Sequence, residues 1–140
     1  MKLTLEKTSI ICDKALEKAR ELKIRPLCIA VLDDGGNLKA LKREDGASVL
    51  RPSIATGKAW SAVGMGESSR RLENRLKERP AFLGALSAMS GGKVVPVPGG
   101  VLIMDGNEII GAAGASGGTA DEDETCVVAG IQAAGLEHKI

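Results

Sequence analysis

The most informative stretch of this sequence is IGAAGASGGT, residues 110–119, which runs directly into the acidic segment ADEDE, residues 120–124. Thr119 followed three residues later by Glu122 is the signature of a capping box, in which each side chain binds a backbone N–H at the start of a helix. The pattern predicts a glycine-rich turn followed by a capped helix over residues 120–136.

The segments before this turn predict a β-hairpin. Residues 100–104 and 108–115 are strand-like, and Asp105-Gly106-Asn107 between them is typical of a tight turn. Further back, Val94-Val95-Pro96-Val97-Pro98 is extended but contains two prolines, which cannot donate to a sheet. It is predicted to be an edge strand or a loop.

The N-terminal part predicts a helix and a second hairpin. Residues 5–23 carry apolar side chains at helical spacing, and Thr4 can cap that helix. Residues 27–32 form a continuous apolar run that suits a buried strand. The polar turn at residues 33–37 then leads into the returning strand, residues 38–43.

Helical segments occupy the middle of the chain. Ser48 is predicted to cap a helix that continues to Gly64 or Gly66, Ser68 and Ser69 precede a basic helix, and Pro80 begins a short helix that ends at Met89. The predicted order is α-β-β-α-α-β-β-β-α, a single α+β domain over residues 1–140. Because hairpins dominate, the sheet should be mostly antiparallel with helices packed on it.

The composition excludes several classes of function. The 140 residues contain one Trp, one Phe and no Tyr, which disfavours the aromatic stacking used by proteins that bind single-stranded nucleic acid. A net charge of +1 gives no overall attraction to nucleic acid or to an anionic membrane. No apolar run approaches a membrane span and no secretory signal is evident, so a cytoplasmic location is expected.

The charges are divided unevenly along the chain. Residues 1–80 contain 17 Lys and Arg against 11 Asp and Glu, whereas residues 81–140 contain 2 against 7. Opposite patches on one small domain favour association between copies. A homo-oligomer, at least a dimer, is therefore predicted.

Metal and disulfide chemistry have little support. Cys12, Cys28 and Cys126 are odd in number and far apart, which is typical of reduced, buried thiols. His138 is the only histidine. A zinc site needs several clustered ligands, so no site built from protein ligands alone is predicted.

An anion-binding site is predicted at the glycine-rich turn. Backbone N–H groups at Ser116, Gly117, Gly118 and Thr119 could bind an oxygen of a carboxylate or phosphate, because the first N–H groups of a helix are free donors. The pair Gly99-Gly100 would leave further backbone accessible. The alternative is that these glycines only form a tight turn beneath a packed helix.

Charged side chains could complete this site. Arg43 and Lys58 could clamp a carboxylate, and Asp45 or Asp123 could orient the cation or move a proton. The alternatives are solvated charges for Arg43 and Lys58, and compensation of the helix dipole for Asp123 and its acidic neighbours.

Four short motifs in order resemble a known family. They are AVLDxxG at 30–36, REDGA at 43–47, IAxxKA at 54–59, and IGAAGASGG at 110–118 with Asp123-Glu124 behind it. Over nearly its whole length the chain resembles the GlcG/HbpS-like haem-binding or haem-degrading family, which includes the C-terminal domain of PduO-type proteins.

The resemblance implies a five-stranded antiparallel sheet with flanking helices, similar to profilin-like domains, and a homo-oligomer. It also implies a haem, corrinoid or other small-molecule ligand held between subunits. Three kinds of function stay open: a binding protein, a metal-independent isomerase or tautomerase acting on a small carboxylated substrate, and an accessory protein whose glycines serve packing alone.

Overall fold

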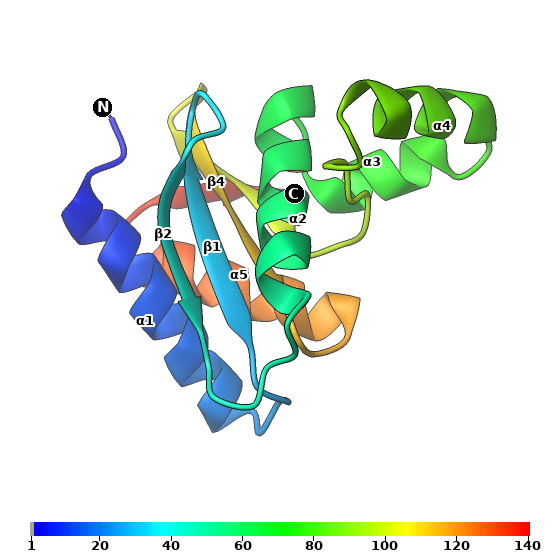
Figure 1. Cartoon of the computed structure of the whole chain (residues 1–140). Helices are drawn as coiled ribbons and strands as arrows, with labels where there is room; N and C mark the ends of the chain where they lie inside the picture. Colours follow the sequence, from blue (N-terminus) through cyan, green and yellow to red (C-terminus); the bar gives the residue numbers. More distant parts are fainter. Residues whose placement is uncertain (1) are drawn as a thin grey trace.

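The computed structural model describes residues 2–140 as five helices and five strands (Figure 1). In chain order they are α1 (Leu5–Glu21), β1 (Cys28–Asp33), β2 (Leu38–Arg43), α2 (Arg51–Met65), α3 (Ser69–Leu76), α4 (Pro80–Met89), β3 (Gly100–Asp105), β4 (Glu108–Ser116), α5 (Ala120–Ala133) and β5 (Glu137–Lys139).

The five strands form one sheet in the order β2-β1-β4-β3-β5, and every neighbouring pair is antiparallel. The α+β class and the five-stranded antiparallel sheet are confirmed. The fifth strand is β5, at the C-terminal end, rather than residues 94–98. Those residues form a loop, in which Val95 donates its N–H to the Ser61 side chain instead of to a strand.

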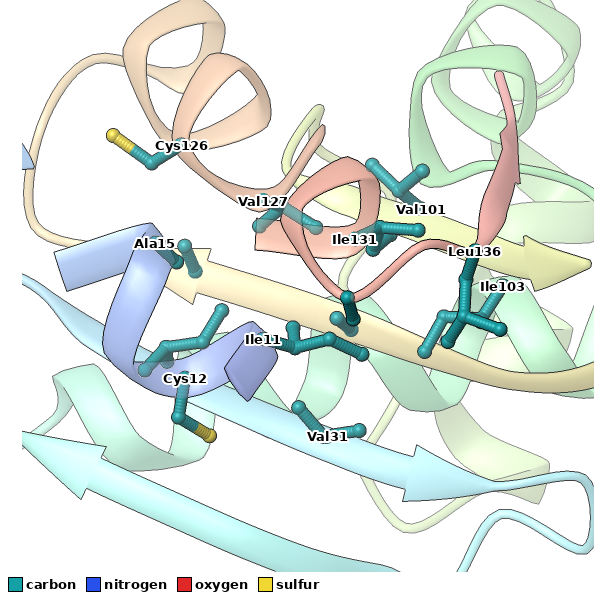
Figure 2. Close-up of a cluster of buried hydrophobic side chains, with 14 of the residues drawn as sticks. Ile11, Cys12, Ala15, Val31, Val101, Ile103, Cys126, Val127, Ile131 and Leu136 are labelled. Carbon is teal, nitrogen blue, oxygen red and sulfur yellow. The ribbon is translucent and has the colours of Figure 1, made fainter. Parts of the chain in front are cut away.

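Helices cover both faces of the sheet. α1 and α5 pack on one face, where Ile11, Val127 and Ile131 meet Val31 and Ile103 in the largest buried cluster (Figure 2). α2 packs on the other face, and Figure 1 shows α3 and α4 beyond it. No helix within residues 2–140 has the length and apolarity needed to cross a bilayer.

Glycines let α2 lie very close to the sheet. A Cβ added to Gly100 would meet the Lys58 carbonyl oxygen at 2.2 Å, and one added to Gly114 would meet the Ala55 carbonyl oxygen at 2.2 Å. At this distance the Cβ would clash with the carbonyl oxygen, and the backbone of α2 would have to move. These two glycines are therefore required by the packing of helix against strand.

Most of the predicted helix caps are confirmed. The Thr4 and Ser68 side chains accept backbone hydrogen bonds at the starts of α1 and α3, and Thr119 forms the complete capping box with Glu122. The predicted Ser48 cap is wrong. α2 begins after Leu50, without a side-chain cap, because the chain makes a further turn in which the Arg51 N–H binds the Ser48 carbonyl.

All three cysteines are free and buried. Burial raises the pKa of Cys12, Cys28 and Cys126 to about 11 in each case. The nucleophilic thiolate is therefore scarce at neutral pH.

We expect the three thiols to resist alkylation in the native protein at about pH 8 and to react fully in denaturant, because the reagent requires exposed thiolate. Counting modified cysteines by mass spectrometry checks this. Rapid labelling of any one cysteine under native conditions would contradict the burial.

Candidate functional site

A cleft lies between α2, the β1–β2 hairpin and the loop at residues 91–95. Its volume is about 600 Å³. Its walls are largely apolar, with side chains that include Leu41, Leu50, Ile54, Trp60 and Val95.

The loop at residues 91–95 is fixed on the edge of this cleft. The Val95 N–H donates to Ser61 Oγ at 2.8 Å, and the Gly92 N–H donates to the Ser87 carbonyl at 2.8 Å. Between these anchors, Lys93 places its ammonium group 5.7 Å from the centre of the Trp60 ring. This is cation–π distance.

Lys93 carries the only charge among the residues that line the cleft, and none of them is His, Cys, Met or Tyr. The arrangement can accept an apolar body with an acidic group. The described residues also contain no cluster of three His, Cys, Asp or Glu able to hold a metal ion.

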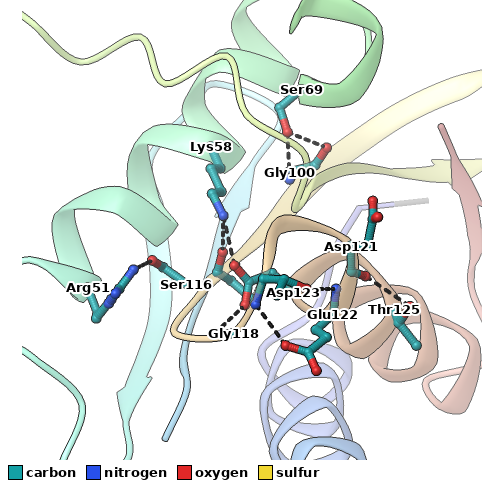
Figure 3. A network of polar contacts seen from close by, with 12 residues as sticks. Arg51, Lys58, Ser69, Gly100, Ser116, Gly118, Asp121, Glu122, Asp123 and Thr125 are labelled. Carbon is teal, nitrogen blue, oxygen red and sulfur yellow. Dashed lines mark hydrogen bonds and ion pairs between the residues drawn. The ribbon is translucent and has the colours of Figure 1, made fainter. Parts of the chain in front are cut away.

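A separate polar network lies at the C-terminal end of β4, where α2 and α5 meet (Figure 3). Lys58 Nζ from α2 lies 3.0 Å from Asp123 Oδ2 in α5 and donates to the Ala115 carbonyl at 2.9 Å. The side chains of Lys58 and Asp123 are 4% and 2% exposed. The pair therefore joins α2, β4 and α5 away from solvent.

Opposing effects act on the pKa of the Asp123 carboxyl. Burial raises the pKa of its carboxyl above the ordinary value, while Lys58 and the Gly118 N–H act to lower that pKa. We regard the raised direction as the net effect because the carboxyl is almost fully withdrawn from water.

Several polar groups at the glycine-rich turn already have partners within the chain. The Gly118 N–H binds Asp123 Oδ1 at 2.9 Å, and the Thr119 N–H binds Glu122 Oε1 at 2.8 Å. Ser116 Oγ accepts from Arg51 Nη1 at 3.1 Å. Gly117 lies against the Pro26 carbonyl, where an added Cβ would come within 2.2 Å.

The other predicted site residues lie outside the cleft. Gly99 and Gly100 contact Lys58, so they sit beside the buried pair rather than in the cleft. Arg43 and Asp45 are exposed at the end of β2 and in the following turn. Arg43 is the register partner of Cys28, whose partner on its other side is Ser116.

The sequence reasoning missed three polar or aromatic participants: Arg51, Trp60 and Lys93. Arg51 contacts Ser116, and the other two line the cleft. A signal existed only for Trp60, as the single tryptophan. Nothing local distinguishes Lys93 from a solvated lysine.

Residues 3–132 match the family described as haem degrading protein HbpS-like. The chain belongs to this family. The predicted resemblance is thereby confirmed.

The chain is also similar to part of a PduO protein. The chain is 29% identical over 133 residues to the corrinoid adenosyltransferase PduO of Citrobacter freundii, covering 92% of this chain but 39% of that protein. The chain thus spans well under half the length of this curated relative.

Two solved structures share the fold. A PduOC–haem complex has a TM-score of 0.89 and 26% identity, with all of both chains covered. HbpS has a TM-score of 0.82 and 26% identity, covering 94% of this chain and 89% of that one.

We expect Lys58→Met to lower the free energy of unfolding by about 3–5 kcal/mol, because it leaves the Asp123 carboxylate buried without its opposite charge. The double variant Lys58→Met/Asp123→Leu should recover much of this loss, since no buried charge is left. Urea denaturation monitored by circular dichroism measures both. Equal instability of the single and double variants would contradict the account.

The loss caused by Lys58→Met should be smaller at about pH 5 than at about pH 8. Removing Lys58 removes an influence that lowers the Asp123 pKa, so that carboxyl takes up a proton more readily in the folded state. Its contribution to stability therefore falls as pH rises through the folded-state pKa. The same denaturation curves, measured at both pH values, should show no such dependence in the double variant.

Proposed function

We propose that this chain binds a tetrapyrrole of the haem type in the cleft between α2, the β1–β2 hairpin and the loop at residues 91–95. The observation that carries the proposal is the apolar cleft of about 600 Å³ on a chain of the HbpS-like family. A relative of the same fold is a complex with haem.

The lining of the cleft supports this choice of ligand. Apolar walls with few polar groups are typical of small-molecule sites. Trp60 offers an indole face, and Lys93 offers a cation to a ring carboxylate. When bound, haem iron would supply ligand-binding or redox chemistry, and the residues of this chain would hold and orient the ring.

The cleft is preferred to the glycine-rich turn for two reasons. The N–H groups of Gly118 and Thr119 are used inside the chain, and Lys58 is buried against Asp123. Ligand binding at the turn would require these bonds to open, whereas the cleft is already accessible.

The isomerase alternative stays a prediction without a geometric argument in its favour. Its proton-transfer candidates Lys58 and Asp123 are both buried in one ion pair. Asp45 is exposed and lies outside the cleft. A corrinoid also stays a prediction, and it can be tested as a competitor for the same cleft.

We expect haem to quench the fluorescence of Trp60, and Leu50→Asp to weaken its binding about tenfold, or about 1.4 kcal/mol, by placing a charge on the apolar wall. Leu5→Asp is the matched control. Leu50 is 65% exposed in the cleft and Leu5 is 63% exposed on α1, outside it. Equal effects of the two variants, or none, would overturn the site.

Association between copies is a further part of the proposal. Some of the opposite charge of the two halves is paired within the chain, since Arg70 binds both Asp121 and Glu124. Exposed apolar side chains at Leu38, Val49 and Leu50, of which the first and last line the cleft, favour contact with a second copy.

Light scattering at micromolar concentration should give a mass of at least twice the 14.5 kDa of one chain, because these apolar side chains would be buried between copies. A mass near 14.5 kDa would contradict the homo-oligomer.

A further inference from the structure

We infer that the cleft recognises the porphyrin ring and its carboxylates rather than a metal at the centre of the ring, with Lys93 as the residue that selects an acidic ligand. The inference rests on the proposed function, because it concerns the same cleft. It follows from the side chains that line the cleft, and from the position of the possible iron ligands elsewhere in the fold.

Side chains that coordinate haem iron well lie outside the cleft. Iron is normally held by His, Cys, Met or Tyr, and none of these types lines it. His138 pairs with Ile103 on β5, at the opposite edge of the sheet from β2. Ile103 faces α1 and α5, so its cross-strand neighbour His138 is also on the sheet face opposite α2.

The sulfur-containing residues are no better placed. Cys28 is fully buried beneath Ala55, and Met104 is packed in the cluster of Leu32 and Leu102. Met89 is exposed at the end of α4, two residues before the loop, but it is not a lining residue. An iron atom in the cleft would therefore receive no strong protein ligand from the lining.

Contact with the faces of the ring takes the place of coordination. Leu41, Ile54 and Trp60 line the cleft from β2 and α2, and burial of apolar surface does not depend on a central metal. A metal-free porphyrin presents the same two faces as haem. The walls should bind both nearly equally.

Lys93 supplies the selectivity. It stands between two anchored points of its loop, and Gly91 and Gly92 before it adopt left-handed φ values of 66° and 82°. No acid is among the lining residues, so the Lys93 ammonium is available to an acidic group on a ligand. A ring with carboxylates is favoured over an uncharged one.

The first test compares protoporphyrin IX with its zinc and iron(III) complexes by quenching of Trp60. The three dissociation constants should agree within about tenfold. Iron(III) binding more than tenfold tighter than the metal-free ring, with a six-coordinate spectrum that Met89→Leu or His138→Ala abolishes, would overturn the inference while leaving the proposed function intact. Failure of all three to bind would instead overturn the proposed function.

The second test uses Lys93→Gln, with Lys77→Gln as the control because Lys77 is exposed on α3's C-terminal side, outside the cleft. Lys93→Gln should weaken protoporphyrin IX about three- to fivefold, as expected for a partly exposed ion pair, and leave its dimethyl ester unaffected. Equal effects of Lys93→Gln on acid and ester, or no effect on either, would overturn the role of Lys93.

Discussion

The arrangement of the helices around the sheet depends on one buried ion pair, Lys58 with Asp123. It connects the middle of α2 to the first turn of α5. Lys58 also donates to the Ala115 carbonyl, and Asp123 also accepts from the Gly118 N–H. Removing a charge from water is costly unless every partner is present. The helix positions are therefore coupled: a shift of α2 or α5 would leave one charge unpaired.

The groups that hold this small fold together are therefore separate from the surface that is open to a ligand. The polar groups at the end of the sheet bind one another and hold the elements together, and Lys58 and Asp123 among them are withdrawn from solvent. The accessible site is instead the apolar cleft between α2, the β1–β2 hairpin and the loop at residues 91–95. The same helix thus presents Lys58 inward to the network and Trp60 outward to the cleft, two positions apart.

Features encoded by neighbouring residues could be predicted from the sequence, whereas those built from distant segments could not. The capping box at Thr119 and Glu122 and the turn at residues 33–37 are local, and both are observed. The cleft unites residues from β2, α2 and the loop at 91–95, so no single window contains it. Lys58 was expected to clamp a ligand because its partner lies 65 residues further along the chain. β5 is too short to give a periodic pattern.

The order of the strands also determines how long one edge of β1 stays unpaired during synthesis. β2 follows β1 after a short turn and pairs with one of its edges. The other edge pairs with β4, which is synthesised much later, since Asp33 pairs with Gly111 and Cys28 with Ser116. At ordinary translation rates the intervening stretch of about 80 residues takes about 4–16 s to synthesise. During that time an apolar strand has an open edge, the kind of surface that recruits other strands.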